Sequence, residues 1–550
     1  MSLRPRDLTE SRRQAIQVAL DAGRMATERN RLGQFGTPNA LSTEIAQYVR
    51  SVASRHLQRI RFADPAIGTG SFYSAALSAF GHEHIENAVG IEIDKAFCEA
   101  ARELWGPAGL ELVEGDFTRI VASENRPGPP NLILANPPYV RHHHMTREDK
   151  ERLQSLAVRM AGVKVSGLAG LYVYFLLLAT AWMEEGGYAA WLIPSEFMDV
   201  NYGAALRQYL AENVTLLRVH RFAPHDVQFA DALVSSVVLV FRKTPPPRNH
   251  AAEFSFGGTL HEPDALDLIP LDQLNESRKW TVYPGHASND RHPSGDKDGA
   301  TLGDLFRIQR GIATGNNKFF VMDRREAEQR GFPKHYLKPI LPGPRSLKTT
   351  ALDADKDGYP LIEKQSVVID CDLPEATLKS RYPAFWEYLQ TAETLGIKEG
   401  YLVSKRSPWY KQERREPAPF LCTYMGRGSG HDKPFRFIWN RSQAIATNLY
   451  LMLYPVNALA RMLRLHPGRA ADVLTLLGQI TGHELRGEGR VYGGGLHKIE
   501  PKELSRISAK AFIERWPELR TAPKHQPGLF SSVSERPRAY IAAPRHSRSR

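Results

Sequence analysis

Short apolar runs punctuate residues 1–243, and each of the first four leads into a polar residue. Three of them, at 60–64, 88–94 and 111–116, end in acids, and the fourth, at 131–135, leads into an amide. Apolar runs without polar alternation are typical of strands that are buried on both faces of a sheet. Segments suited to helices separate these runs. The pattern therefore predicts an α/β fold with a mostly parallel, Rossmann-like sheet.

Three later apolar segments, at 188–194, 216–222 and 233–241, extend the predicted sheet to seven strands. Before them, residues 171–182 (LYVYFLLLATAW) are apolar throughout. A bilayer requires about 20 apolar residues, so this shorter stretch predicts a helix buried against the sheet. We expect no leader, lipid anchor or membrane segment, and a cytoplasmic location.

A proline run at 245–247 follows the last predicted strand of the sheet. Because consecutive prolines form stiff, extended spacers, we interpret residues 244–260 as a linker. The first domain would then span residues 1–243, and a second, mixed α+β domain would span 261–520. Residues 521–550 are arginine-rich and lack a hydrophobic period, which predicts a basic, disordered tail.

The strand at 60–64 runs into a glycine turn and then a helix, the element at which α/β folds bind nucleotides. Gly68 and Gly70 allow the backbone to come close to a ligand. Tyr73 replaces the third glycine of the dinucleotide fingerprint, and the Gly-Lys-Ser/Thr of a phosphate-binding loop is absent. Asp64 precedes the turn, where a carboxylate would attract a ligand ammonium group rather than a pyrophosphate. The turn therefore favours a cationic ligand over NAD.

Two more acids follow the next two strands. Glu92 is placed to accept hydrogen bonds from both hydroxyls of a ribose, the usual role of an acid after the second strand. Asp116 could accept from an adenine amino group, and Phe117 could cover that ring. A cation, a ribose and an adenine together describe S-adenosylmethionine, which we expect as the cofactor.

The sequence Asn-Pro-Pro-Tyr, residues 136–139, stands at the end of the fourth strand. Its prolines remove two N–H donors, so peptide carbonyls there can face a ligand that donates hydrogen bonds. The side-chain oxygen of Asn136 can accept one proton of an exocyclic amine, and a carbonyl beside Pro137 can accept the other. Tyr139 offers a face on which a base can stack. Two acceptors aimed at its protons make such an amine a better nucleophile.

Taken in order, residues 64–72 (DPAIGTGSF), 90–94 (GIEID), 115–117 (GDF) and 136–139 (NPPY) resemble the adenine-N6 DNA methyltransferases of restriction–modification systems. The likeness is greatest to the TaqI-like group, which has a carboxyl-terminal target-recognition domain. This resemblance implies a site-specific enzyme that flips an adenine out of double-stranded DNA. It would transfer the methyl group of S-adenosylmethionine to N6 of that adenine.

The same resemblance implies further site residues. Phe35 and Thr37, in the segment 33–38 (GQFGTP), would contact the methionine part of the cofactor. Phe229 would pack against the flipped base on the side opposite Tyr139. The turn that encloses the methionine and the ribose would include Asp64, Ala66, Gly68 and Gly70, and Asn136 would also contact the cofactor.

Composition narrows the class of protein. A net charge of +12 and a pI of about 9.4 fit a polyanionic partner. Cys98, Cys371 and Cys422 are far apart, which argues for a reducing cytosol and against a disulfide framework. Three consecutive histidines, 142–144, cannot all point at one ion, and no cysteine or acid cluster accompanies them. We therefore expect no metal and interpret this run as a solvated or DNA-facing loop.

Arginines and aromatic residues interleave in the second half of the chain, a composition that suits phosphate contacts combined with base-edge or shape readout. Any one of these clusters could equally be a half-buried strand with a charged, solvated face. Lys498 follows a glycine loop that could approach the DNA backbone. The expected DNA-binding residues are Arg406, Trp409, Arg427, Arg441 and Lys498.

Other functions remain open from residue chemistry. A glutamine-N5 protein methyltransferase would use the same Asn-Pro-Pro-Tyr grip on a side-chain amide, although the basic, aromatic second half favours DNA. A combined restriction–modification enzyme and a non-catalytic DNA-binding subunit are further alternatives. Cytosine-N4 methylation shares the grip as well. We expect a monomer, with any cognate restriction endonuclease encoded as a separate chain.

Overall fold

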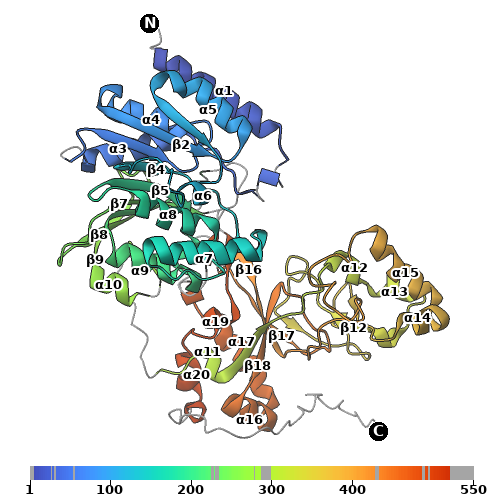
Figure 1. Cartoon of the computed structure of the whole chain (residues 1–550). Coiled ribbons are helices and arrows are strands. Elements are labelled where there is room, and N and C mark those ends of the chain that lie inside the picture. The colour runs from blue at the N-terminus through green and yellow to red at the C-terminus, as the bar shows by residue number, and fades with distance from the viewer. Residues whose placement is uncertain are drawn as a thin grey trace, which may run out of the picture.

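The computed structural model describes two halves, one coloured blue to green and one yellow to red (Figure 1). The described residues are all except 1–4, 26–27, 30–31, 54–55, 224–227, 229–234, 278, 286–298, 428–432, 483, 486–489, 493–495 and 521–550. The expected tail therefore lies outside the described residues. No described helix is long and apolar enough to cross a membrane.

The N-terminal half is built on one nine-stranded sheet with the order β3-β2-β1-β4-β5-β7-β6-β8-β9. Strands β3, β2, β1, β4 and β5 are mutually parallel, and β7 is antiparallel to both of its neighbours. The strands are β1 (Ile60–Asp64), β2 (Ile85–Glu92), β3 (Leu110–Glu114), β4 (Leu132–Ala135), β5 (Tyr188–Pro194), β6 (Thr215–Arg221), β7 (Ser236–Arg242), β8 (Ala251–Phe256) and β9 (Ala265–Pro270). The α/β class and the seven expected strands are confirmed.

The predicted linker at 244–260 is wrong. Strand β8 lies within it and pairs in parallel with β6, and β9 then pairs with β8. Strand β6 is at the edge of the predicted seven-stranded sheet, and its free backbone groups are satisfied by β8. The N-terminal sheet therefore extends to residue 270, and the proline run is a connection within one sheet.

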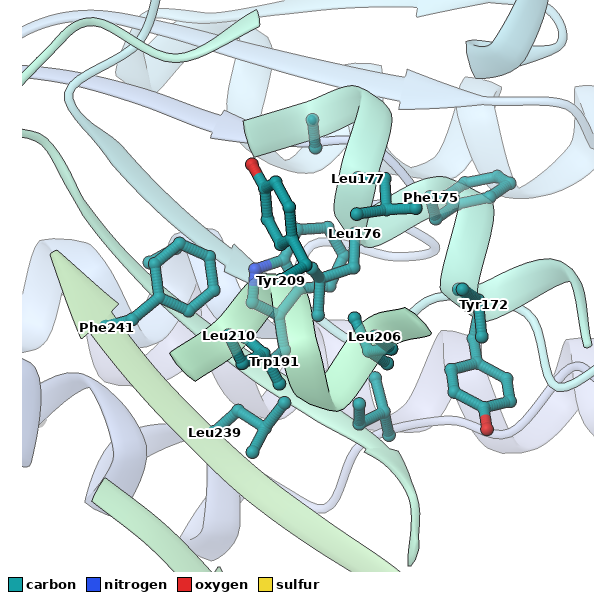
Figure 2. Close-up of a cluster of buried hydrophobic side chains, with 14 of the residues drawn as sticks. Tyr172, Phe175, Leu176, Leu177, Trp191, Leu206, Tyr209, Leu210, Leu239 and Phe241 are labelled. Atoms are coloured by element: carbon teal, nitrogen blue, oxygen red, sulfur yellow. The ribbon is translucent and has the colours of Figure 1, made fainter. Parts of the chain in front are cut away.

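Helices cover both faces of this sheet. One core cluster joins α3 (Asn39–Ala53), α4 (Ser71–Phe80) and α5 (Lys95–Trp105) to the strands, and the other joins α7 (Arg147–Ala161), α8 (Leu171–Trp182) and α9 (Ala204–Glu212). Figure 2 shows strand residues Trp191, Leu239 and Phe241 packed with α8 and α9. Helix α8 is apolar all round because neighbours surround it, as the sequence predicts. Helices α1 (Pro5–Ala22), α6 (Phe117–Ile120) and α10 (Leu271–Glu276) complete this half.

The described strands of the C-terminal half form three sheets with the orders β10-β18-β15-β17-β13, β11-β14-β12 and β16-β20-β19. They are β10 (Phe306–Arg310), β11 (Val321–Asp323), β12 (Leu337–Ile340), β13 (Ala351–Leu352), β14 (Ser366–Ile369), β15 (Phe420–Thr423), β16 (Met425–Arg427), β17 (Phe437–Asn440), β18 (Tyr450–Pro455), β19 (Arg490–Tyr492) and β20 (Leu496–Lys498). The helices are α11 (Leu302–Leu305), α12 (Asn317–Phe320), α13 (Arg324–Gln329), α14 (Glu375–Arg381), α15 (Pro383–Thr394), α16 (Asn457–Leu465), α17 (Ala470–Gln479), α19 (Pro501–Leu504) and α20 (Lys510–Arg515). This half has the expected mixed α+β character.

Candidate active site

The polar strand ends meet at one edge of the N-terminal sheet. Because β3, β2, β1 and β4 run parallel, their carboxyl ends lie side by side at that edge. The edge carries Asp64 as the last residue of β1, Glu92 as the last residue of β2, Asp116 shortly after β3 and Asn136 directly after β4. This is where open α/β sheets bind ligands, so the structure brings the four predicted site residues to one place.

The glycine turn after β1 is tied to the acid at the end of β2. The backbone N–H of Gly68 donates to Glu92 Oε2 at 2.9 Å, and the N–H of Ala66 donates to Asp64 Oδ1 at 3.0 Å. Gly68 and Gly70 have φ values of 55° and 90°, which favour glycine. A Cβ on Gly70 would lie 2.4 Å from Nε1 of Trp105. A side chain at Gly70 would therefore collide with Trp105, whereas at Gly68 only the left-handed backbone favours glycine.

The two acids of this turn are held in a poorly hydrated place. Asp64 is only 2% exposed, and its burial raises the pKa of its carboxyl to about 8. The Ala66 N–H opposes that shift, and the nearby Glu92 charge adds to it. Burial likewise raises the pKa of Glu92, against hydrogen bonds from the Asp94 and Gly68 amides. A ligand that brings a cation would relieve this arrangement, so the site fits the ammonium and ribose of S-adenosylmethionine.

The expected adenine contacts after β3 are engaged elsewhere. Asp116 caps α6, accepting from the Thr118 N–H at 2.9 Å, and Arg152 lies 3.7 Å from its carboxylate. Phe117 is 1% exposed, and its ring packs against Phe175 at 5.0 Å. Phe117 is thus a core residue, and the expectation that it covers the adenine is not met by this geometry. An aromatic residue at a strand end suits the core as well as it suits a ligand.

Asn136 is oriented by its amide nitrogen. Nδ2 donates to the carbonyl of Phe35 at 2.9 Å and to Oγ1 of Thr37 at 3.1 Å. Both donors of the amide are thereby used, which leaves Oδ1 as its acceptor. This oxygen is buried and has no hydrogen-bond donor among the described residues. A buried, unsatisfied acceptor is costly, and its presence favours a ligand that donates a hydrogen bond to it.

Tyr139 is more enclosed than the sequence suggests. It is 7% exposed, its hydroxyl donates to the Leu192 carbonyl at 3.1 Å, and its ring packs against Phe35 with centroids 5.6 Å apart. Phe35 therefore occupies part of the space beside this ring, where the sequence predicts that a base stacks. Phe229, the expected partner on the other face of the base, lies outside the described residues.

The sequence patterns did not identify three residues that lie near the glycine turn. Arg13 of α1 is 2% exposed, and its guanidinium donates to Thr69 Oγ1 at 3.0 Å, while Gln17 of α1 accepts from the same hydroxyl at 2.8 Å. Helix α1 therefore closes over the glycine turn.

Ile93 is 68% exposed beside Glu92, so it is a better placed apolar cover for an adenine than Phe117. An apolar residue between two acids, as in Glu92-Ile93-Asp94, is the signal that could have found it.

Most of the expected DNA-binding residues have partners within their own half. The guanidinium of Arg406 donates to the carbonyls of Thr314 at 2.9 Å and Ala313 at 2.5 Å. The ring of Trp409 packs against the rings of Phe319 and Phe320. Arg441 forms a salt bridge with Asp353 at 2.5 Å, and Lys498 forms one with Glu500 at 3.0 Å. Arg406 and Trp409 therefore hold local structure. Arg427, at the end of β16, is exposed and is the best placed of the five.

Comparison with known proteins connects both halves to one group. Residues 126–228 match the model of the Eco57I restriction-modification methylase, and residues 291–524 match that of the C-terminal domain of the type II methyltransferase M.Eco57I. The first match includes β4 and the Asn136–Tyr139 segment. The type II methyltransferase M.XamI of Xanthomonas campestris pv. amaranthicola is 28% identical over 462 residues, covering 81% of this chain and 80% of that protein.

One further relative and one solved structure were also found. The type II methyltransferase M.AccI of Acinetobacter calcoaceticus is 24% identical, over 87% of this chain and 85% of that protein. Among solved structures, the type IIL restriction-modification enzyme MmeI in complex with DNA aligns over 90% of this chain and 66% of that chain, with a TM-score of 0.49 and 12% identity. The resemblance to the methyltransferases of restriction–modification systems is confirmed at the level of type II methyltransferases. The narrower TaqI-like assignment stays a prediction.

Proposed function

We propose that this chain is a DNA methyltransferase of a restriction–modification system that transfers a methyl group from S-adenosylmethionine to N6 of adenine. The observation that carries the choice of an amine is the unsatisfied acceptor Oδ1 of Asn136. Thr37 connects this amide to the cofactor turn, because its hydroxyl accepts from Asn136 and its carbonyl accepts from Ser71 Oγ at 3.2 Å. The matches to type II methyltransferases support DNA as the substrate.

The residues position an amine rather than react covalently with it. When bound, the cofactor supplies an electrophilic methyl group on a sulfonium. Asn136 Oδ1 would accept a hydrogen bond from one amine N–H and a carbonyl beside Pro137 would accept one from the other, which leaves the nitrogen lone pair free to attack. The nitrogen–methyl bond would form as the sulfur–methyl bond breaks, the electron pair of the broken bond would stay on sulfur, and the methylated nitrogen would release one proton to solvent. These acceptors cannot reach N6 inside a stacked duplex, so the adenine must be flipped out.

Cofactor binding tests the assignment of Glu92. Glu92→Gln removes the negative charge and leaves one oxygen acceptor, so we expect cofactor affinity to fall by about 1 kcal/mol, the difference between a charged and a neutral hydrogen bond. Calorimetry with S-adenosylmethionine measures this loss. Glu86→Gln is the matched control, because Glu86 lies near the opposite end of β2 and is exposed. Equal affinities of the wild-type protein and Glu92→Gln would remove Glu92 from the site.

The methylated base is tested by modification-sensitive sequencing of DNA from cells that express the protein. N6-methyladenine at one recurring motif is the expected result. N4-methylcytosine at such a motif would overturn the choice of base. Unmodified DNA together with N5-methylated glutamine in a protein would instead favour the protein methyltransferase.

We also propose that methyl transfer and selection of the DNA sequence reside in different parts of the chain. The boundary between the two parts lies after residue 285, since β8 and β9 belong to the N-terminal sheet. One flipped adenine cannot distinguish one DNA sequence from another, so residues 299–520 would select the site. A chain ending at Gly285 is expected to bind S-adenosylmethionine but to lose methylation of the recurring motif. A chain ending at Pro247 lacks two strands of the sheet and should melt at a lower temperature. Selective methylation by the chain ending at Gly285 would contradict this division.

A further inference from the structure

Three consecutive histidines form a turn directly beside the base-binding loop. The 3-10 turn His142–His144 follows Tyr139 after only Val140 and Arg141. Its imidazoles pack on one another, with ring centroids 5.4 Å apart for the first pair and 4.2 Å for the second. Arg141, His143 and His144 are exposed. The carboxyl edge of β4 therefore presents a guanidinium and a row of imidazoles to solvent.

Charges of both signs surround this turn. Arg141 and Lys150 are positive, and Glu196 is negative. The first turn of α7 carries the acids Glu148 and Asp149, of which Asp149 lies 3.7 Å from Arg152. Partial burial lowers the pKa of His142, and the charges of Lys150 on α7 and of Arg141 act in the same direction, whereas Glu196 opposes them. Partial burial also lowers the pKa of His143, followed by the effects of its two neighbouring imidazoles, Arg141 and Lys150. At neutral pH these two imidazoles are therefore mostly uncharged. An anion placed against the turn would favour their protonated forms.

The turn also lies on the side where a DNA partner is expected. Helix α7 begins at Arg147, just after the turn, and lies on the side of the N-terminal half that is nearer to the C-terminal half (Figure 1). A base that reaches Asn136 from a duplex leaves its flanking phosphates close to the loop that follows Asn136. Phosphate is the anion that such a cationic turn suits, and each new contact releases counterions.

We propose that Arg141 and His142–His144 bind the phosphate beside the flipped base, and that this contact takes up protons so that DNA binds more tightly at lower pH. The proposal rests on the proposed function, since it requires DNA as the partner. The sign follows from linkage: groups that are neutral in the free protein and protonated in the complex make affinity rise as pH falls. The turn thereby adds a phosphate contact that carries no sequence information.

The test uses the full chain and a mixed-sequence DNA duplex. Fluorescence anisotropy gives the dissociation constant at about pH 6 and about pH 8, the range in which histidine titrates. The wild-type protein is expected to bind severalfold more tightly at the lower pH, and the variant H142Q/H143Q/H144Q is expected to lose this difference. The matched control is H82Q/H84Q, whose two exposed histidines precede β2 at the opposite edge of the sheet. It should behave as the wild-type protein does.

A second variant tests the phosphate contact without titration. Arg141→Gln is expected to reduce the slope of log affinity against log salt by about 0.9, the value for one lost phosphate contact. An unchanged slope, or pH dependence that survives in the triple histidine variant, would overturn the proposal. Methyl incorporation into DNA by the wild-type protein separates the two hypotheses. If it is absent, the proposed function fails, whereas normal incorporation with unchanged binding by both variants rejects only the phosphate contact.

Discussion

Asn136→Ala is expected to reduce methyl transfer by at least about 100-fold, comparable to the loss of one preorganised catalytic hydrogen bond. The variant removes the buried acceptor Oδ1 that we propose to face the amine. Binding of S-adenosylmethionine and of DNA should change little, because the cofactor acids and the C-terminal half are intact. Single-turnover incorporation of labelled methyl groups into DNA measures the effect.

Thr37→Val is the matched control for this variant. It removes the hydroxyl that accepts from Asn136 but leaves the Phe35 carbonyl, so the amide keeps one of its two orienting partners. We expect a smaller loss of turnover, between those of the wild-type protein and Asn136→Ala. Near wild-type turnover by Asn136→Ala would refute the role of its side chain.

Cofactor affinity is expected to rise by up to about 100-fold from pH 6 to pH 8. If binding releases one proton, affinity rises tenfold for each pH unit. In the protein without cofactor, burial raises the pKa of Asp64 to about 8, so its carboxyl is mostly protonated at neutral pH. A ligand ammonium binds the carboxylate and displaces that proton. Affinity should therefore increase as pH rises and level off above about pH 8.

Titration of Asp64 should also affect the free energy of unfolding, which we expect to fall as pH rises, whereas cofactor affinity is expected to increase. The pKa of Asp64 is higher in the folded chain than its ordinary value of 3.8, so folding favours the protonated form. Its contribution to the free energy of unfolding is largest at low pH and is lost as pH rises through about 8. Asp64→Asn should weaken both pH dependences in calorimetry and thermal melts and leave the part that comes from Glu92, whose pKa burial also raises, whereas Asp272→Asn, at an exposed carboxyl, should leave both unchanged. Undiminished pH dependence in Asp64→Asn would assign it to another group.

The strand ends were predictable because their signals are local. An apolar run that ends in Asp64, Glu92 or Asn136 specifies both a buried strand and a polar group at its carboxyl end, and parallel pairing then collects these groups. The sequence does not show β8, because a proline run precedes it and its partner β6 is distant in the chain. Nor does it show that Arg406 binds the carbonyls of Ala313 and Thr314, since only the fold brings them together. Phe117 and Tyr139 are more buried than expected, because an aromatic side chain serves a core and a ligand equally well.

Residues 33–37 contact both the proposed base-binding residues and the start of α4 beside the cofactor turn. The Gly33 carbonyl accepts from the Tyr139 N–H at 3.0 Å, the Phe35 ring lies on Tyr139, and Thr37 joins Asn136 to the start of α4. A cofactor that contacts Phe35 and Thr37, as the sequence predicts, would act on the same segment that touches the Tyr139 ring and orients Asn136. Binding of the methyl donor and binding of DNA should therefore be coupled. By thermodynamic reciprocity, each should tighten the binding of the other by the same factor.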